Sequence, residues 1–341
     1  MKNILLIKLR FIGDVVLCTP LLPLIRKQYP QAKITFLVNP GTAEILENNP
    51  YVDEVWKLSR QSLREQFKFI QKLRNQKFDV VLDLTDGDRS AFLAWATGAP
   101  VRIGYNREHR WRGKLYTQVL PSEYGTMHMV DYHQQALGRL GIHEAVGKPE
   151  MFVPSEASQS DKDVLSQVPN GQPIVLIHPR ARYDNKAWPL ERFAKVADWL
   201  SEQGIRIALI GGQEDIFLGQ QILNVTTSKP ENLMGQTSLS QLGAVMKRSQ
   251  LLIGNDGGPM HMAAAVGCPV IGLFGPTDPA VWGPRGSKIK VIYKGIDCEK
   301  CFYTECLRGE ESCMRQISVE EVYQAAQSLL SIPVKSSLKI D

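Results

Sequence analysis

Residues 253–261 of the chain read Ile-Gly-Asn-Asp-Gly-Gly-Pro-Met-His. An apolar strand ends here, a carboxylate and two glycines form the turn, and Pro259 suits the first turn of a following helix. A strand that passes into a helix in this way is the repeating unit of α/β proteins. Free backbone N–H groups at the helix start attract a phosphate, and Gly257 and Gly258 place no side chain in its way. An ordinary turn in which Asp256 caps the helix explains the same residues equally well.

The rest of the chain repeats this alternation of strand and helix. Residues 4–9 form an apolar run broken only by Lys8, as expected of a strand covered on both faces. After a turn at Gly13 and Asp14, residues 15–28 carry apolar side chains at helical spacing. Strict alternation predicts parallel sheets with right-handed crossovers. Further strands are predicted at 34–38, 52–58, 80–84, 101–103, 174–177, 205–210, 251–253 and 270–274, and helices at 62–76, 190–203, 214–225, 239–248, 259–266 and 318–330.

Two domains are expected, because 341 residues exceed the usual size of one. Residues 144–172 are polar and punctuated by proline and glycine, which indicates a connection, and the alternation restarts after them. We therefore expect two doubly wound halves with a cleft between them. The predicted divisions are a domain over 1–165, a domain over 166–317, and a terminal segment over 318–341.

Composition narrows the class of protein. The chain is 43% hydrophobic and 22% charged, as ordinary soluble globular proteins are, which excludes disorder. A net charge of +5 is compatible with a phosphate-bearing partner or an anionic membrane surface, but it falls short of a nucleic-acid footprint. Lys8, Arg10 and Asp14 interrupt the N-terminal apolar run too early for a signal peptide, and no stretch of about 18 apolar residues occurs. A cytosolic protein is expected.

Several common motifs are absent. No G-x-G-x-x-G follows the first strand, and Gly113 and Lys114 are followed by Leu115 instead of the Ser or Thr of a P-loop. Neither H-E-x-x-H nor G-x-S-x-G occurs. The sequence therefore disfavours dehydrogenases, P-loop NTPases, zinc proteases and α/β-hydrolases.

Two loops of the second half carry candidate ligand-binding charges. Arg180, Arg182 and Lys186 follow its first strand, at the end where open α/β sheets bind ligands. Lys186 could neutralise a pyrophosphate, although three solvated cations would give the same pattern. Glu214 follows the next strand and could accept hydrogen bonds from a ribose diol, although an acidic residue at a helix start also complements the helix dipole.

The first half offers a base and a basic patch. Asp14 leaves the first strand and could act as a general base facing the cleft, or it could cap the following helix. A basic and aromatic stretch follows the strand at 101–103 and could hold a phosphorylated or acidic acceptor, or form a solvated loop. Its members are Arg102, Tyr105, Arg107, Arg110, Trp111, Arg112, Lys114 and Tyr116.

Four of the six cysteines, Cys298, Cys301, Cys306 and Cys313, lie within 16 residues. Four thiolates at this density could hold Zn²⁺ tetrahedrally. The spacing between Cys306 and Cys313 matches no standard zinc module, so we expect no bound metal. If the protein does bind a metal, this cluster is where we expect it.

Taken together, these segments resemble the family 9 glycosyltransferases, the ADP-heptose:lipopolysaccharide heptosyltransferases. The matches run in order along nearly the whole chain. They include residues 7–20, 78–84 and 102–105 of the first half, and 178–179, 186–189, 211–215, 256–261 and 274–277 of the second. Residues 84–89 and the Arg-Ala-Arg-Tyr loop at 180–183 look most like the branch that adds the third, side-chain heptose.

The resemblance implies a GT-B architecture of two Rossmann-like domains, with the acceptor bound by the first and the donor by the second. It implies inverting, metal-independent transfer of heptose from ADP-heptose to the lipopolysaccharide inner core, with no cofactor. The partners expected are the donor, the acceptor and the inner face of the cytoplasmic membrane, with which a monomeric, cytoplasmic enzyme would associate peripherally. No nucleic acid is expected. In GT-B chains a terminal helix often packs back on the first domain, so the helix at 318–330 is expected to do so.

The resemblance also assigns roles to residues. Asp14 matches the family's base, and Lys186 matches the lysine that stabilises the leaving diphosphate. The remaining donor positions are Arg182, Glu214, Asp256, Gly257, Gly258 and His261, and the acceptor candidates are Arg10, Arg107, Arg110 and Arg112. Ala181 and Arg182 stand where some members carry two threonines before the lysine, so the hydroxyl contacts to the phosphate are either lost or replaced by Arg182.

Two alternatives remain open at this point. The chain could be another GT-B transferase, or an epimerase, that uses a different nucleotide sugar. It could also be a non-catalytic, two-lobed binding protein, although such receptors carry a signal peptide.

Overall fold

The computed structural model describes residues 1–59, 62–121, 123–154, 173–296, 298, 301 and 306–331. The chain divides into two compact units, Met1–Phe152 and Val153–Asp341. The division follows Phe152, whereas the sequence predicts a boundary after residue 165. Residue 165 lies in the stretch 155–172, which is outside the described residues.

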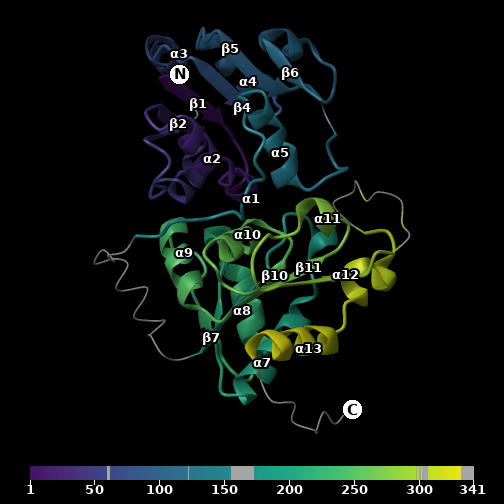
Figure 1. Ribbon diagram of the computed structural model, residues 1–341. Coiled ribbons are helices and arrows are strands. Elements are labelled where there is room, and N and C mark those ends of the chain that lie inside the picture. Colours follow the sequence, from purple (N-terminus) through teal and green to yellow (C-terminus); the bar gives the residue numbers. More distant parts are fainter. Residues whose placement is uncertain are drawn as a thin grey trace. The chain divides into compact units, whose positions relative to one another are not determined.

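The first unit is built on a six-stranded parallel sheet in the order β3-β2-β1-β4-β5-β6 (Figure 1). From β1 the chain adds strands β2 and β3 on one side, and from β4 it adds β5 and β6 on the other. The strand order therefore reverses between β1 and β4, which is the topological switch point of this sheet. In open α/β sheets, ligands bind at the carboxyl ends of the strands at such a point. The strands are β1 (Asn3–Ile7), β2 (Lys33–Val38), β3 (Glu54–Lys57), β4 (Val80–Asp83), β5 (Val101–Tyr105) and β6 (Gln118–Leu120).

Helices connect these strands. They are α1 (Ile12–Val16), α2 (Leu21–Gln28), α3 (Leu63–Asn75), α4 (Asp88–Ala96) and α5 (Met129–Gly138), with the short 3-10 helices η1 (Pro40–Ile45) and η2 (Trp111–Leu115). The sequence predicts one helix over 15–28, but the chain forms α1 and α2 instead. Pro20 lacks the N–H that an uninterrupted helix needs at its position, and the Thr19 hydroxyl donates to the Val16 carbonyl at 2.7 Å.

The second unit repeats the same topology, in the order β12-β11-β10-β7-β8-β9. Its switch point lies between β7 and β10. The strands are β7 (Ile174–His178), β8 (Arg206–Leu209), β9 (Glu231–Asn232), β10 (Leu251–Asn255), β11 (Val270–Phe274) and β12 (Ile289–Tyr293). The helices are η3 (Asp184–Lys186), α7 (Leu190–Glu202), η4 (Gln213–Asp215), α8 (Ile216–Val225), α9 (Leu239–Arg248), α10 (Gly258–Ala265), α11 (Pro279–Trp282), η5 (Gly309–Glu311), α12 (Cys313–Gln316) and α13 (Val319–Leu330).

The central strands explain why both sheets form. Every residue of β7 and β10, and four of the five in β1, is buried, so both faces of each sheet are covered. Ile4 pairs with Ile34 on one side and Val80 on the other, in parallel register. The two doubly wound parallel sheets that the sequence predicts are confirmed.

The expected position of the last helix is wrong. Helix α13 begins at the predicted capping box, where Ser318 and Glu321 bond each other's backbone N–H groups. Its buried face, which includes Val322 and Ala326, belongs to the same hydrophobic cluster as α7, β7 and β10 of the second unit. Tyr323 stacks on Trp199 of α7, with ring centroids 4.5 Å apart. The apolar stripe that we expected to cover the first domain therefore completes the core of the second.

Within the described part of the chain, no helix is long and apolar enough to cross a membrane.

Candidate active site

The switch point of the second sheet gathers the predicted donor residues. β7 and β10 pair in parallel, so the loops that follow them start side by side. The loop after β7 carries Arg182 and Lys186, and the residue after β10 is Asp256. Glu214 lies in η4, which follows β8, the other neighbour of β7. Three adjacent strand ends thus present these four side chains at one edge of the sheet.

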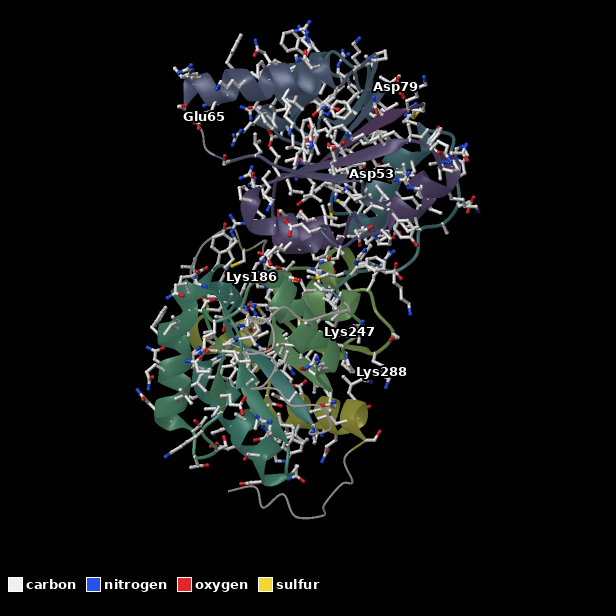
Figure 2. The ribbon with its side chains drawn as sticks, turned by 90° about the vertical axis from the view of Figure 1, so that its left-hand side faces the viewer. Asp53, Glu65, Asp79, Lys186, Lys247 and Lys288 are labelled. Carbon is white, nitrogen blue, oxygen red and sulfur yellow. The ribbon has the colours of Figure 1, made fainter. Side chains whose placement is uncertain are left out.

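Lys186 and Asp256 form an ion pair across this edge. Lys186 Nζ lies 3.0 Å from Asp256 Oδ2, and the two side chains are 24% and 11% exposed. Lys186, labelled in Figure 2, ends the 3-10 helix η3, whose first turn begins after the extended residue Tyr183. A partly buried ammonium at a strand end is suited to neutralising a phosphate group.

Asn255 fixes the two loops to each other. It is fully buried at the end of β10, its Oδ1 accepts the Trp188 N–H at 3.1 Å, and its Nδ2 donates to the Pro179 carbonyl at 2.7 Å. Both partners lie in the loop after β7. The loop is thus anchored on both sides of Lys186 in the chain, which fixes the position of this lysine.

The N-terminus of α10 is open to an anion. Its N-cap is Gly257, in an extended conformation, which has no side chain to cap the N–H groups of the first turn. The expected alternative, in which Asp256 caps the helix, is not what the structure adopts. Gly258 begins the helix and Pro259 lies in its first turn, as the sequence predicts. Unsatisfied N–H groups and the helix dipole together favour a phosphate.

Two buried histidines lie at this edge. His178 ends β7, and a Cβ on Gly257 would stand 3.7 Å from its Cε1, so the ring borders the start of α10. Burial, assisted by the charge of Arg180, lowers the pKa of His178 to about 4, and the ring is therefore neutral at pH 7. His261 is 5% exposed on the buried side of α10.

Arg182 and Glu214 are exposed, in contrast to Lys186. Arg182 lies over the ring of Tyr183, with its guanidinium carbon 5.3 Å from the centroid. The loop that carries Glu214 is held by its neighbour Asp215, which accepts the Gly212 N–H at 2.8 Å. Both side chains project from anchored loops next to the Lys186–Asp256 pair.

In the first unit, Asp14 lies at the other switch point. It occupies the third position of α1, so it is not the N-cap, which is Phe11. Its Oδ2 accepts the Phe11 N–H at 3.1 Å, and its Oδ1 lies 3.2 Å from Lys8 Nζ. The Asp14 side chain is 20% exposed, which leaves the carboxylate accessible to a ligand.

The acceptor candidates of the first unit separate into exposed and buried side chains. Arg10 is exposed, and the side chains of Arg107 and Arg110 are 43% and 51% exposed. Arg107 stacks on the ring of Tyr124 at 4.2 Å, and Arg110 lies 3.2 Å from Glu108. These three cations remain candidates for contacting an acceptor.

Arg112 does not fit the expected acceptor role. Its side chain is only 3% exposed, and its guanidinium pairs with Asp86 at 2.8 Å, Asp88 at 3.1 Å and Glu108 at 3.3 Å. The three carboxylates come from the loop after β4, from α4 and from the loop before η2. Arg112 therefore ties these segments together, and its charge is already balanced.

The four clustered cysteines are free thiols. Cys313 is half-buried, and burial raises the pKa of its thiol, with a further increase from Cys306 and Cys301. Asn185 Nδ2 donates to Cys301 Sγ at 3.1 Å. In the described ranges no group of three or more metal-type ligands occurs, but residues 299, 300 and 302–305 of this segment lie outside them. The metal content of the cluster stays a prediction.

Comparison with known proteins matches this chain to one family. Residues 66–311 match the family model described as glycosyltransferase family 9 (heptosyltransferase), which is more than half of the chain. The chain belongs to glycosyltransferase family 9. It is 30% identical over 334 residues to lipopolysaccharide heptosyltransferase 3 of Escherichia coli (strain K12), covering 94% of this chain and 96% of that one.

Solved structures of family 9 have the same fold. The family 9 glycosyl transferase from Veillonella parvula DSM 2008 superposes with a TM-score of 0.85 at 26% identity and 97% coverage of both chains. The E. coli ADP-heptose lps heptosyltransferase II superposes with a TM-score of 0.82 at 25% identity, over 97% of this chain and 99% of that one. The protein is thus a glycosyltransferase of the α/β GT-B class, as its sequence resemblance implies.

Sequence reasoning assigned no role in this candidate site to three of its residues. Asn255 and His178 both end buried strands, and a polar residue at the carboxyl end of an otherwise apolar strand is the signal that could have found them. Lys8 is a lone cation in an apolar run, which we used only to exclude a signal peptide.

Proposed function

We propose that this family 9 enzyme transfers heptose from ADP-heptose to the inner core of lipopolysaccharide, with inversion at the anomeric carbon and without a metal ion. The names of its relatives support the donor and the acceptor class. The 30% identity to a heptosyltransferase 3 supports addition of the third heptose.

The observation that carries the proposal is the meeting of Lys186 and the open N-terminus of α10 at the β7–β10 switch point. As the bond between the anomeric carbon and ADP breaks, the leaving diphosphate takes the electron pair. The Lys186 ammonium and the N–H groups at Gly257 and Gly258 then stabilise the developing negative charge. A fixed ammonium and helix dipole supply the positive charge that a divalent cation provides elsewhere.

We assign the other donor contacts to residues that follow strands β7, β8 and β10. We assign Arg182 to the diphosphate, Glu214 to the ribose hydroxyls, and Asp256 and His261 to the sugar and its diphosphate. Asp256 also holds Lys186 in place through the 3.0 Å ion pair.

Asp14 is the proposed general base. The acceptor hydroxyl oxygen forms its bond to the anomeric carbon from the side opposite ADP, which inverts the configuration. Its proton passes to the Asp14 carboxylate as that bond forms. A carboxylate already fixed by the Phe11 N–H and Lys8 loses little freedom when it engages the hydroxyl. We assign Arg10, Arg107 and Arg110 to anionic groups of the acceptor.

Peripheral association with the inner face of the cytoplasmic membrane completes the proposal, because the acceptor is lipid-anchored. Helix α3, on which Figure 2 labels Glu65, exposes Leu63 and Phe67 at 84% and 61%, next to the exposed cations Arg64 and Lys68. Apolar side chains flanked by cations favour an anionic lipid surface.

Product analysis tests the proposal. The purified enzyme is incubated with ADP-heptose and a truncated core lipopolysaccharide, with and without EDTA, and the product is examined by mass spectrometry and NMR. We expect one added heptose, an inverted anomeric configuration and an EDTA-independent rate. Thermal stabilisation by UDP or GDP, but not by ADP, would instead indicate a different nucleotide-sugar donor.

A further inference from the structure

Lys8 is a buried lysine directly behind the proposed base. It follows β1, its backbone N–H still donates to the Leu37 carbonyl at 3.0 Å, and the residue is 4% exposed. Burial of an ammonium is costly unless partners compensate it. An apolar side chain at this position would continue the apolar strand without the cost of burying an ammonium. Packing alone therefore does not explain why the residue is a lysine.

The Lys8 ammonium has three partners from three different elements. Nζ donates to the Leu84 carbonyl, after β4, at 2.9 Å, pairs with Asp14 Oδ1 at 3.2 Å, and lies 3.4 Å from His133 Nε2 on α5. A lysine carries three N–H donors, which matches these three acceptors. Burial, and then the charge of Lys8, keep the pKa of His133 well below its usual range, so that ring is neutral and able to accept.

The groups around Lys8 keep it charged. Burial lowers the pKa of Lys8, but the charge of Asp14, the hydrogen bond to it and the charge of Asp83 raise it, and the net value lies above the ordinary one. Burial raises the pKa of the Cys18 thiol to about 12, so the thiol is neutral at pH 7. Burial also raises the pKa of the Asp83 carboxyl, whose Oδ2 accepts the Tyr116 hydroxyl at 2.7 Å. Asp14 is therefore the accessible anion that faces the ammonium.

We infer that Lys8 is the positioning residue for Asp14, fixing the orientation of its carboxylate through Oδ1. The Phe11 N–H fixes Oδ2, and each oxygen keeps a lone pair for the acceptor hydroxyl. Lys8 touches no substrate and acts through Asp14, so its role rests on the proposed function.

This role predicts a split between kcat and KM that packing alone would not produce. Loss of Lys8 removes the partner 3.2 Å from Asp14 Oδ1, so the carboxylate loses its fixed orientation toward the acceptor hydroxyl and kcat falls. Donor binding does not depend on Asp14, so KM for ADP-heptose stays unchanged.

The experiment compares Lys8→Met, Lys8→Gln and Lys8→Arg with the parent. Gln keeps N–H donors for Leu84 and His133 but has no charge, so it provides a folded, uncharged variant if Met unfolds the core. Lys27→Met, on the exposed surface of α2, is the matched control. Circular dichroism confirms folding, and kcat and the KM for ADP-heptose are measured for each variant.

We expect Met and Gln to lower kcat by about tenfold or more while KM for ADP-heptose stays unchanged, and Arg to restore part of kcat. Folded Met or Gln variants that keep the parent's kcat would overturn the role of Lys8. If Asp14→Asn loses activity in the same assay while the Lys8 variants do not, only this inference fails. If Asp14→Asn stays active, the proposed base fails as well.

Discussion

Lys186 Nζ lies 3.0 Å from Asp256 Oδ2, and the two residues follow neighbouring strands that meet at the switch point of the second sheet. The pair places a positive charge beside the free N–H groups of α10, which is the arrangement that a leaving diphosphate requires. Lys186 comes from the loop after β7, Asp256 and the α10 N–H groups come from the loop after β10, and Asn255 fixes these two loops together.

Replacing Lys186 with alanine should weaken donor binding and slow transfer together. The ammonium interacts with the diphosphate before the bond breaks and more strongly as charge develops, so both KM and kcat change. Calorimetry with ADP and steady-state kinetics measure the two effects. Lys195→Ala, on the exposed surface of α7, is the control. Unchanged affinity and turnover in Lys186→Ala would show that this lysine is only a solvated cation.

Arg112 should contribute to stability and not to catalysis. In Arg112→Met, Asp86, Asp88 and Glu108 lose their shared partner, so the free energy of unfolding should fall by roughly 2–3 kcal/mol. This is less than for a fully buried pair because two of the carboxylates are well exposed. Urea denaturation measures the loss, with Arg110→Met as the exposed control. Equal stability of the two variants would contradict the structural role.

His178 gives the stability a pH dependence of known sign. The folded pKa, about 4, is lower than that of an unfolded histidine, about 6.5, so the unfolded state binds more protons between these values. Stability should therefore fall as the pH is lowered through this window, by up to about 1.4 kcal/mol per pH unit. In His178→Asn this part of the slope disappears, whereas the exposed His143→Asn keeps it. Identical slopes in His178→Asn and the parent would contradict the burial of a neutral ring.

The α3 surface should bind anionic membranes. The double variant Leu63→Ser, Phe67→Ser removes the exposed apolar side chains, so it should sediment less with vesicles that contain phosphatidylglycerol. Added salt should weaken binding of the parent because it screens Arg64 and Lys68. Leu307→Ser, equally exposed at 84% but on the second unit, is the control. Equal sedimentation of parent and double variant would remove α3 from membrane binding.

The sequence predicts the fold well where burial is complete. The strands at 4–9, 174–177 and 251–253 are apolar on both faces, and each is found with small changes at its ends. Strand β12 was missed, because its residues are half-exposed and alternate with lysines as edge strands do. The position of α13 was wrong, because an amphipathic pattern shows that a face is buried but not which sheet buries it.

The loop residues of the site can be predicted from the sequence, but the buried residues that hold those loops and Asp14 in place can be predicted much less well. Residues at strand ends and helix starts, such as Lys186 and Asp256, carry a local pattern. Lys8 is held by Leu84 and His133, and Asn255 by Pro179 and Trp188, and no local pattern encodes contacts between residues more than 60 positions apart. Arg112 was assigned wrongly for the same reason, since Asp86 and Asp88 become its partners only after folding.

The most direct test of the account is the turnover of Asp14→Asn. Asparagine keeps the size of the side chain and can still accept the Phe11 N–H, but it cannot take a proton from the acceptor hydroxyl. We expect a folded protein that binds ADP as the parent does and transfers heptose roughly 10²–10⁴ times more slowly, which is the usual contribution of a general base. A folded Asp14→Asn enzyme whose turnover stays within about threefold of the parent would contradict the proposed mechanism.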